Sequence, residues 1–237
     1  MYLVKDQIIT YDELRTAVGG GQIQQGINFR YKGGLSVILM RTTEGAPYED
    51  RVIDDGRVLI YEGHNVKRSS KVPNPRLFDQ VLSNKNGTPT ANGLFYDAVT
   101  FAKKGIAPVE KIRAFERLQK GLWVFNGVFD LTDAWSESDG TREVFKFRLE
   151  LSDSQIGVSS ISETDVTTEL PVRRLIPSEV KQEVFKRDKG ACVLCGSREN
   201  LHYDHDLPFS KGGTSLIAEN IRLLCATHNL RKRDRIE

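Results

Sequence analysis

The residues best suited to chemistry lie close together in the sequence. All three cysteines and three of the four histidines fall within 37 residues. Cys192-x-x-Cys195 and Cys225-x-x-His228 are separated by 29 residues, and they have the ligand types and paired spacing of a tetrahedral structural zinc site. The odd cysteine count argues against a disulfide framework. We therefore expect a Zn²⁺ ion that stabilises a small module, the alternative being buried free thiols beside a surface histidine.

A second cluster lies between the two zinc-ligand pairs. The segment 201–213, LHYDHDLPFSKGG, carries Asp204, His205 and Asp206 beside a proline and a Gly-Gly turn. A histidine with its ordinary pKa of about 6.5 is partly neutral and can accept a proton, and carboxylates bind hard divalent ions. The cluster is a candidate for metal binding or proton transfer, or it is a polar surface hairpin. His202 is expected to be a strand-surface histidine.

The order of these motifs resembles that of the zinc-containing HNH endonucleases. Cys-x-x-Cys is followed by Asp-His, a proline, Gly-Gly and Asn220, and then by Cys-x-x-His with Asn229 directly after it and a basic tail. The resemblance covers about residues 176–235 and implies a ββα-metal fold, in which a hairpin faces a helix. Many such modules end in Cys-x-x-Cys-Asn, whereas here His228 stands at the last ligand position. His228 either completes the zinc site, which we favour, or joins the catalytic ion.

This resemblance implies a role for each residue of the motifs. His205 would be the general base that activates water, and Asp204 and Asn229 would hold one catalytic Mg²⁺ or Mn²⁺ ion. Asn220 would fix the orientation of the imidazole. One such site cuts one strand, so a double-strand break would require a homodimer or two enzymes. Phosphate contacts are expected from basic side chains, namely Lys211, Arg222, Arg231, Lys232, Arg233 and Arg235.

Charge is distributed unevenly along the chain. Residues 170–237 hold 13 Lys and Arg against 9 Asp and Glu, which leaves 21 against 23 in the preceding part, so the two parts carry +4 and −2. A slightly basic module suits a polyanionic partner such as DNA. A zinc-stabilised DNA-binding knuckle without activity is the alternative to a nuclease.

The preceding part of the chain has the pattern of a β-rich domain. Runs rich in Val, Ile, Phe, Tyr and Trp predict strands at 35–40, 57–63, 122–135 and 142–151. Helices are predicted at 10–18, 75–84, 95–105 and 176–190. The expected fold class is therefore α+β, with a curved or closed sheet and a small zinc-stabilised module.

Several motifs in this domain resemble the SRA domain, also called YDG. Residues 34–65, GLSVILMRTTEGAPYEDRVIDDGRVLIYEGHN, match its core, and Asp79-Gln80-x-Leu82 matches a further segment. Asn126-Gly127 stands where that family has Asp-Gly. The resemblance covers about residues 20–151 and implies an SRA/PUA-like curved sheet or barrel with flanking helices. SRA domains flip a modified cytosine, usually 5-methylcytosine, out of duplex DNA into an aromatic pocket.

The same resemblance assigns the pocket. Tyr48 and Tyr61 would sandwich the flipped base, and Asp50 would accept a hydrogen bond from its exocyclic amine. Glu62 and His64 are also expected to contact base or DNA, His64 from a loop that enters the duplex. The alternative for the two tyrosines is packing inside a barrel.

The expected organisation is an SRA-like reader at 1–165, the end of a linker at 166–175 and an HNH module at 176–237. The linker is indicated by a Ser, Thr, Asp and Glu-rich span, 152–170, and by the lack of Lys and Arg between positions 148 and 173.

The sequence predicts a DNA endonuclease of the modification-dependent (type IV restriction) class that acts on 5-methylcytosine or 5-hydroxymethylcytosine DNA. The alternatives are an HNH nuclease that does not depend on modification and a non-catalytic reader. No stretch of eighteen apolar residues occurs, and the amino terminus has no secretory pattern, so a cytoplasmic location without membrane contact is expected.

Overall fold

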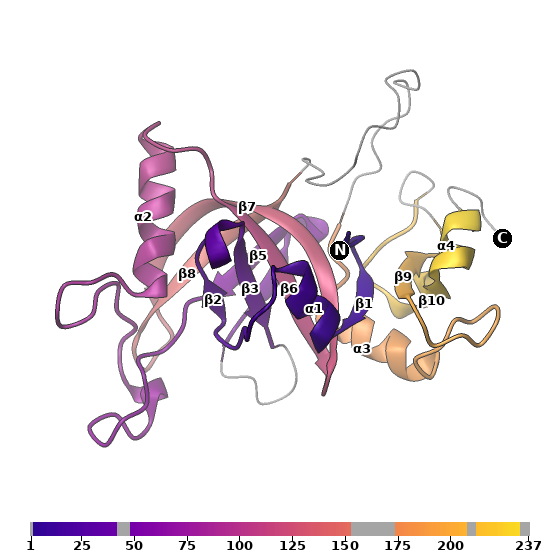
Figure 1. Cartoon of the computed structure of the whole chain (residues 1–237), viewed down its shortest axis with the longest axis horizontal. Coiled ribbons are helices and arrows are strands. Elements are labelled where there is room, and N and C mark those ends of the chain that lie inside the picture. The colour runs from indigo at the N-terminus through magenta and orange to yellow at the C-terminus, as the bar shows by residue number, and fades with distance from the viewer. Residues whose placement is uncertain (1, 42–47, 153–173, 208–211, 233–237) are drawn as a thin grey trace.

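The computed structural model describes residues 2–41, 48–152, 174–207 and 212–232. These residues form a mixed α+β structure with a sheet-rich core and few helices, which confirms the predicted class (Figure 1). The helices are α1 (Tyr11–Ala17), α2 (Ala91–Lys103), α3 (Ser178–Arg187) and α4 (Ala226–Lys232). The strands are β1 (Gln7–Thr10), β2 (Ile27–Asn28), β3 (Ser36–Met40), β4 (Arg51–Ile53), β5 (Val58–Glu62), β6 (Lys111–Gln119), β7 (Leu122–Ser138), β8 (Glu143–Leu151), β9 (Leu201–His205) and β10 (Ile221–Cys225). Of the predicted linker 166–175, all but the last two residues lie outside the described ranges.

The strands belong to one ten-stranded sheet centred on β7. One path through it runs β10-β9-β1-β7-β6-β3-β2, and β8, β5 and β4 continue from the other half of β7. The β3–β6 pair is parallel, and the chain crosses over between these strands through β4, β5 and α2. In Figure 1 the long strands β7 and β8 curve around the body of the sheet, which agrees with the predicted curvature.

Strand β7 carries a bulge at Asn126. Ala114 pairs with Gly127 and Phe115 pairs with Phe125, so Asn126 is left over in the register. Gly127 follows with φ +115°, a conformation that L side chains rarely adopt. A bulge redirects the side chain of the extra residue, and the amide of Asn126 is buried at 1% exposure.

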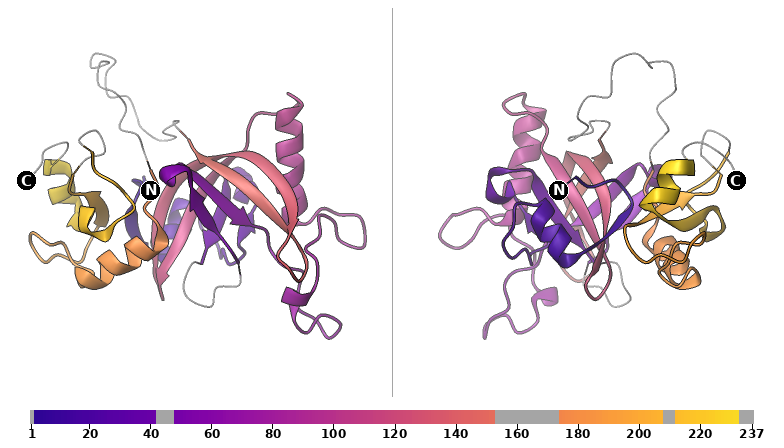
Figure 2. Two further views of the ribbon diagram at one scale, coloured as in Figure 1. Left: turned by 180° about the vertical axis from the view of Figure 1, so that it is seen from behind. Right: turned by 45° about the vertical axis from the view of Figure 1, so that its right-hand side comes forward.

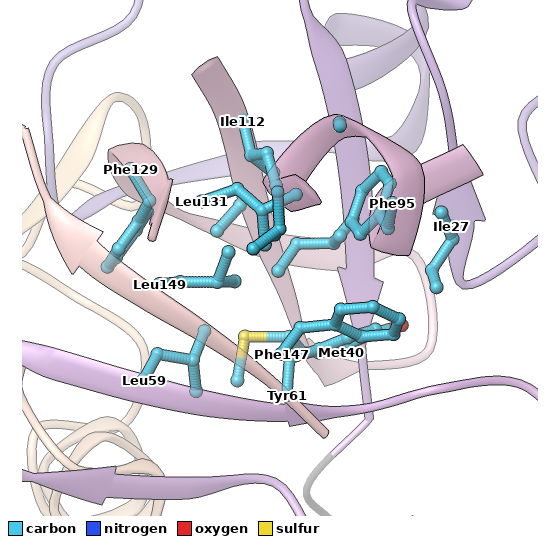
Figure 3. Packing of buried hydrophobic residues seen from close by; sticks show 14 of the residues in the cluster. Ile27, Met40, Leu59, Tyr61, Phe95, Ile112, Phe129, Leu131, Phe147 and Leu149 are labelled. Atoms are coloured by element: carbon cyan, nitrogen blue, oxygen red, sulfur yellow. The ribbon is translucent and has the colours of Figure 1, made fainter. Parts of the chain in front are cut away.

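The largest apolar cluster lies within the curved sheet (Figure 3). Side chains from β3, β5, β6, β7 and β8 form one cluster with Phe95 of α2, and the rings of Phe95 and Phe147 meet edge to face with centroids 5.4 Å apart. Tyr61 belongs to the same cluster and is 3% exposed. This core fixes β5 and the residues at its end.

The zinc-ligand module, residues 174–207 and 212–232, shares its sheet and an apolar core with the preceding part of the chain, residues 2–41 and 48–152, which is called the barrel below because its sheet is curved. Strand β9 pairs with β1 through Gln7 and His202, so β9 and β10 extend the sheet beyond β1 (Figure 1). A second apolar cluster joins Ile8 and Val124 of the barrel to Val180, Val184 and other side chains of the module. Figure 2 shows the module, α3 to α4, against the β1 side of the sheet and α2 at the opposite end.

A buried ion pair crosses this boundary. The Nζ of Lys181 in α3 lies 2.6 Å from Oε2 of Glu116 in β6 and 2.7 Å from Oδ1 of the bulged Asn126. The Lys181 and Glu116 side chains are 1% and 4% exposed. The hydroxyl of Tyr203 donates to the carbonyl of Lys181 at 2.8 Å. The bulge therefore serves the packing of the module on the barrel.

Three of the four predicted helices are present. Thr10 caps α1 through a capping box with Glu13, Thr90 caps α2, and Val180 and Val184 bury the apolar face of α3. The helix predicted at 75–84 is wrong. Pro75–Leu77 forms one 3₁₀ turn, Phe78 is extended, and the backbone N–H of Gln80 donates to Glu143. Tertiary hydrogen bonds prevail over local helix propensity there.

Candidate functional site

The four expected zinc ligands converge on one point. Their ligand atoms all lie within 4.8 Å of one another. The Sγ atoms of Cys195 and Cys225 are 3.8 Å apart, and Nδ1 of His228 lies 3.5 Å from Sγ of Cys192 and 3.3 Å from Sγ of Cys225. Zinc–sulfur bonds of about 2.3 Å place two sulfurs of a tetrahedron about 3.8 Å apart. The quartet fits a four-coordinate metal ion, and His228 lies with the thiols.

The surroundings of Cys192 favour its thiolate. Burial opposes ionisation of this thiol, but hydrogen bonds from the backbone N–H groups of Cys225, Leu194 and Cys195 prevail and lower its pKa to about 6. The thiolate is the form of cysteine that binds zinc. The backbone N–H groups of the two ligand pairs therefore favour the form of Cys192 that can bind a metal ion.

The second cluster lies at the end of a hairpin that faces a helix. In the β9–β10 pair, His205 is opposite Ile221 and Asp204 is opposite Arg222. Helix α4 follows β10 directly and contacts both strands. The order is therefore strand, strand, helix, and Cys225 of the metal-ligand quartet lies at the end of the hairpin opposite to His205.

Asn220 holds the loop after β9 and does not contact the imidazole in the described hydrogen bonds. Its Oδ1 accepts from the backbone N–H of Leu207 at 2.8 Å, and its Nδ2 donates to the carbonyls of Leu207 at 3.1 Å and Thr214 at 2.8 Å. The described side-chain partner of the imidazole is Ser215, whose Oγ lies 2.8 Å from Nε2 of His205. We expected Asn220 in that position.

His205 is in an environment that favours the neutral imidazole. Burial lowers its pKa, and nearby charges partly cancel: Asp6 and Asp204 raise the pKa, whereas Lys5 and Lys232 lower it. Lys5 and Asp6 belong to the segment before β1, so the barrel contributes charge to the module. A neutral imidazole at neutral pH can accept a proton.

Lys232 is not the exposed phosphate-binding residue that we expected. It is 2% exposed, and its Nζ lies 2.5 Å from Oδ2 of Asp204 and also bonds the carbonyl of His205. Helix α4 is short, and Lys232 in its last turn points back to the hairpin. The prediction from sequence failed because a basic tail gives no sign of which side chain turns inward.

The catalytic divalent ion has a weaker structural basis than the zinc site. Asp204 and Asn229 supply the oxygen donors that Mg²⁺ prefers. However, the Asp204 carboxylate already contacts the Lys232 ammonium. The Nε of Arg222 also lies 3.8 Å from Oδ2 of Asp204. Among the residues described, the Cys₃His quartet is the group of three or more His, Cys, Asp or Glu arranged to hold an ion.

The other expected residues of the module differ in their surroundings. Asn229 is half-buried in α4. Arg222 pairs with Asp206 at 3.2 Å, and Arg231 is exposed. His202 is buried at 5% exposure between the barrel and the module, not on a surface as we expected. Outside the described residues lie the predicted phosphate contacts Lys211, Arg233 and Arg235.

In the barrel, the expected pocket residues gather at the end of β5. The backbone N–H of Glu62 donates to Oδ1 of Asp50 at 3.0 Å. Burial, and then the charges of Asp50, Tyr48 and Glu62, raise the pKa of Tyr61 well above its usual range. Screening between buried groups is weak, and the charges that shift a pKa are those of nearby groups. Tyr48, Asp50, Tyr61 and Glu62 are therefore close neighbours.

Asp50 has the most perturbed carboxyl of this group. Burial, with a smaller contribution from the neighbouring Glu62 carboxylate, raises its pKa to about 7, against the opposing effects of the hydrogen bond from the Glu62 N–H and the charge of Lys146. At neutral pH such a carboxyl is divided between a form that only accepts and a form that both donates and accepts hydrogen bonds.

Tyr61 and Glu62 have structural partners of their own. The Tyr61 hydroxyl donates to the carbonyl of Leu39 at 3.4 Å, and the ring lies in the core near Met40 and Phe147 (Figure 3). Glu62 is 3% exposed, with its carboxylate 2.8 Å from Nζ of Lys146 and 3.4 Å from NH2 of Arg142. We expected Glu62 to contact base or DNA, but these cations occupy its carboxylate.

Arg142 links this cluster to the segment between β5 and α2. Its NH1 donates to Oδ1 of Asn65 at 2.6 Å and to the carbonyls of Pro75 at 3.0 Å and Phe78 at 3.2 Å. The backbone of His64 is held by the side-chain amide of Asn92 through two hydrogen bonds of 2.9 Å. The segment that begins at His64 projects away from the module (Figure 1) and is anchored at its base.

Sequence reasoning missed Ser215, Arg142 and Lys181. Lys181 had a usable signal, because it lies between Val180 and Val184 on the apolar face of a predicted helix. Arg142 and Ser215 lie in a hairpin turn and a loop, where no periodicity marks a buried position.

Comparisons with solved structures find similar chains that bind or act on modified DNA. One is the SRA domain of SUVH5 in complex with hemimethylated CG DNA, with 24% identity over 67% of this chain and 94% of that chain and a TM-score of 0.44. Another is the SUVH5 SRA domain bound to fully hydroxymethylated CG DNA, with 24% identity over 66% and 95% and a TM-score of 0.43. The DNA modification-dependent restriction endonuclease AspBHI shares 16% identity over 65% and 77%, with a TM-score of 0.45.

No family model matches the chain, and no curated protein matches it. Because the TM-scores lie below 0.5, the function proposed below rests on this chain's own residues. Across the residues that the structure describes, no helix combines the length and the apolar character needed to span a membrane.

Proposed function

We propose that this chain is a DNA endonuclease whose barrel reads a modified cytosine and whose zinc-stabilised HNH module hydrolyses a phosphodiester bond. The observation that carries the proposal is the module itself. A metal-ligand quartet of Cys192, Cys195, Cys225 and His228 stands at the base of a hairpin that ends in His205 and faces a helix. A module with only a structural zinc site would not need a half-buried, neutral histidine beside an aspartate, as His205 stands beside Asp204.

The chemistry assigned to the module is hydrolysis with His205 as the general base. The imidazole takes a proton from water, the resulting hydroxide oxygen bonds to phosphorus, and the bond from phosphorus to the 3′ oxygen breaks. The leaving oxygen takes up a proton from solvent, so the products carry a 5′ phosphate and a 3′ hydroxyl. Arg231, exposed on α4, is suited to a phosphate contact.

The reading function is assigned to Tyr48, Asp50 and Tyr61. A flipped cytosine presents a ring for stacking, an exocyclic amine that donates and a ring nitrogen that accepts. The Asp50 carboxyl, with its pKa of about 7, matches both atoms of that edge when it carries a proton. Tyr48 is half-buried and supplies an aromatic surface, whereas the Tyr61 ring mainly supports the pocket from the core.

The test is cleavage of one plasmid in unmodified, 5-methylcytosine and 5-hydroxymethylcytosine forms. Each is incubated with Mg²⁺, with Mn²⁺ and with a chelator of weak zinc affinity, and nicked and linear products are separated on a gel. We expect cutting of modified plasmid only, its loss in His205→Ala, and loss of discrimination or binding in Asp50→Ala. Equal cutting of all three forms would refute the reading function.

A non-catalytic reader of modified DNA is the second candidate. The contact of Lys232 with Asp204 favours it, because an ammonium group occupies the carboxylate expected to bind the catalytic ion. Binding of modified DNA without cleavage under any metal condition would establish this candidate.

A further inference from the structure

Ser215 is placed to control how the His205 imidazole reacts. Its Oγ lies 2.8 Å from Nε2 of His205, and the residue is 3% exposed. We propose that Ser215 is a positioning residue whose hydroxyl accepts the Nε2–H of His205, so that the lone pair of Nδ1 is left to take the proton from water. The catalytic consequence rests on the proposed nuclease function, whereas the hydrogen bond itself does not.

The loop that carries Ser215 is fixed at several points. The Nδ2 of Asn220 donates to the carbonyl of Thr214, the residue directly before Ser215, and the same amide bonds the backbone of Leu207. Gly213 packs so closely that a Cβ there would lie 1.8 Å from the Leu207 carbonyl oxygen. Asn220 therefore acts on His205 indirectly, because it fixes the backbone on both sides of the loop that presents the serine hydroxyl.

The hydrogen bond matters because a neutral imidazole has two tautomers. One carries the proton on Nδ1 and the other on Nε2, and only the unprotonated nitrogen can act as a base. A hydroxyl fixed at Nε2 favours the tautomer with the proton on that atom and holds the ring plane. When His205 accepts a proton from water, Nδ1–H forms and the Nε2–H···Oγ bond is kept, so no other proton has to move.

A spectroscopic experiment tests the hydrogen bond without reference to activity. Long-range ¹H–¹⁵N spectra of the imidazole nitrogens, assigned with His205→Ala, distinguish the two tautomers. We expect the Nε2–H tautomer in the wild type and a mixture of tautomers in Ser215→Ala. An Nδ1–H tautomer in the wild type, or identical spectra in the two proteins, would overturn the proposal.

Single-turnover cleavage of the modified plasmid tests the catalytic consequence. In Ser215→Ala we expect the maximal rate to fall about 10- to 100-fold, the loss typical when a reactive histidine loses its orienting partner, with half-saturation unchanged within about twofold. Ser215→Thr keeps the hydroxyl and should restore most of the rate. Thr214→Val is the matched control, because its hydroxyl accepts from the N–H of Leu216 and not from the histidine.

The outcomes separate this proposal from the nuclease proposal. Wild-type cleavage with an equal rate in Ser215→Ala overturns the role of Ser215 alone. A wild type that cuts none of the plasmids overturns the nuclease function, and the tautomer spectra then still decide the hydrogen bond. Metal content and the urea midpoint of Ser215→Ala, compared with the wild type, exclude misfolding as the cause of a loss.

Discussion

Replacement of Lys181 by methionine is the sharpest test of how the module is attached to the barrel. The Lys181 ammonium lies 2.6 Å from the Glu116 carboxylate, and both side chains are at most 4% exposed. Methionine keeps the length and the apolar contacts of the side chain but leaves Glu116 without its cation. Loss of one partner of a buried ion pair destabilises a protein by about 3 to 5 kcal/mol, because a charge remains buried.

A double-mutant cycle separates the pair from the packing. Removal of both charges is close to neutral in many proteins, so Lys181→Met combined with Glu116→Gln should recover most of the loss, with a coupling energy above about 2 kcal/mol. Glu116→Gln alone should cost less than Lys181→Met alone, because Asn126 also bonds that side chain, at 3.0 Å.

The assay follows urea unfolding with one probe in each part of the chain. Trp123 and Trp135, the two tryptophans, are both in β7 and report on the barrel, and release of bound zinc to a chromogenic chelator reports on the module. We expect the two transitions to coincide in the wild type, because β1 pairs with β9 and the second apolar cluster is shared. Separate wild-type transitions, or a cycle with no coupling, would refute the reasoning.

The pH dependence of this variant has a defined sign. Burial raises the pKa of Glu116, but the charge and hydrogen bond of Lys181 and the hydrogen bonds of Ser178 and Asn126 prevail, so the pKa is lowered from its ordinary value of 4.5. A depressed carboxyl pKa stabilises the fold above the unfolded-state pKa and loses this effect as the pH falls through the folded-state pKa. The difference between wild type and Lys181→Met should shrink below that ordinary value.

Three further predictions follow from individual residues. The pKa of Asp50 is raised from 3.8 to about 7, so the folded protein should lose stability as the pH rises from about 4 to 7. The loss, measured relative to Asp50→Asn, which does not titrate at this position, should be at most about 4 kcal/mol. Urea midpoints of the two proteins that run parallel from pH 4 to 8 would contradict this. Cys195→Ser should reduce the bound zinc and lower the thermal midpoint of barrel and module together, as read by tryptophan fluorescence, because a closed tetrahedral site loses a ligand; loss of zinc without a change in the barrel signal would count against a shared core. Arg231→Gln should reduce the slope of the logarithm of the DNA-binding constant against the logarithm of the salt concentration by about 0.9, as expected for one lost phosphate contact. Lys232→Gln alters a buried residue, so it should leave this slope unchanged and lower the stability of the fold. Equal slopes in the two variants would argue against this difference between Arg231 and Lys232.

The sequence by itself determined the features that depend on short spacing. The paired ligands Cys192-x-x-Cys195 and Cys225-x-x-His228 predicted a metal quartet, and the structure brings the four together. The start of α1 at Thr10 and the apolar face of α3 could also be predicted from the sequence, because caps and helical periodicity involve residues within one or two turns. The same reasoning failed at 75–84, where the partner of Gln80 is Glu143, more than 60 residues away in the chain.

Only the tertiary structure decided which charged groups are buried and what they face. Lys232 contacts Asp204 and not solvent, Glu62 is occupied by Lys146 and Arg142, and Ser215 stands where Asn220 was expected. Tertiary structure also joined the module to the barrel, through one strand pair and a bulge whose amide meets Lys181. These contacts depend on pairing between distant segments, and the energy of a charge depends on the burial that such pairing creates, which no local pattern of residues encodes.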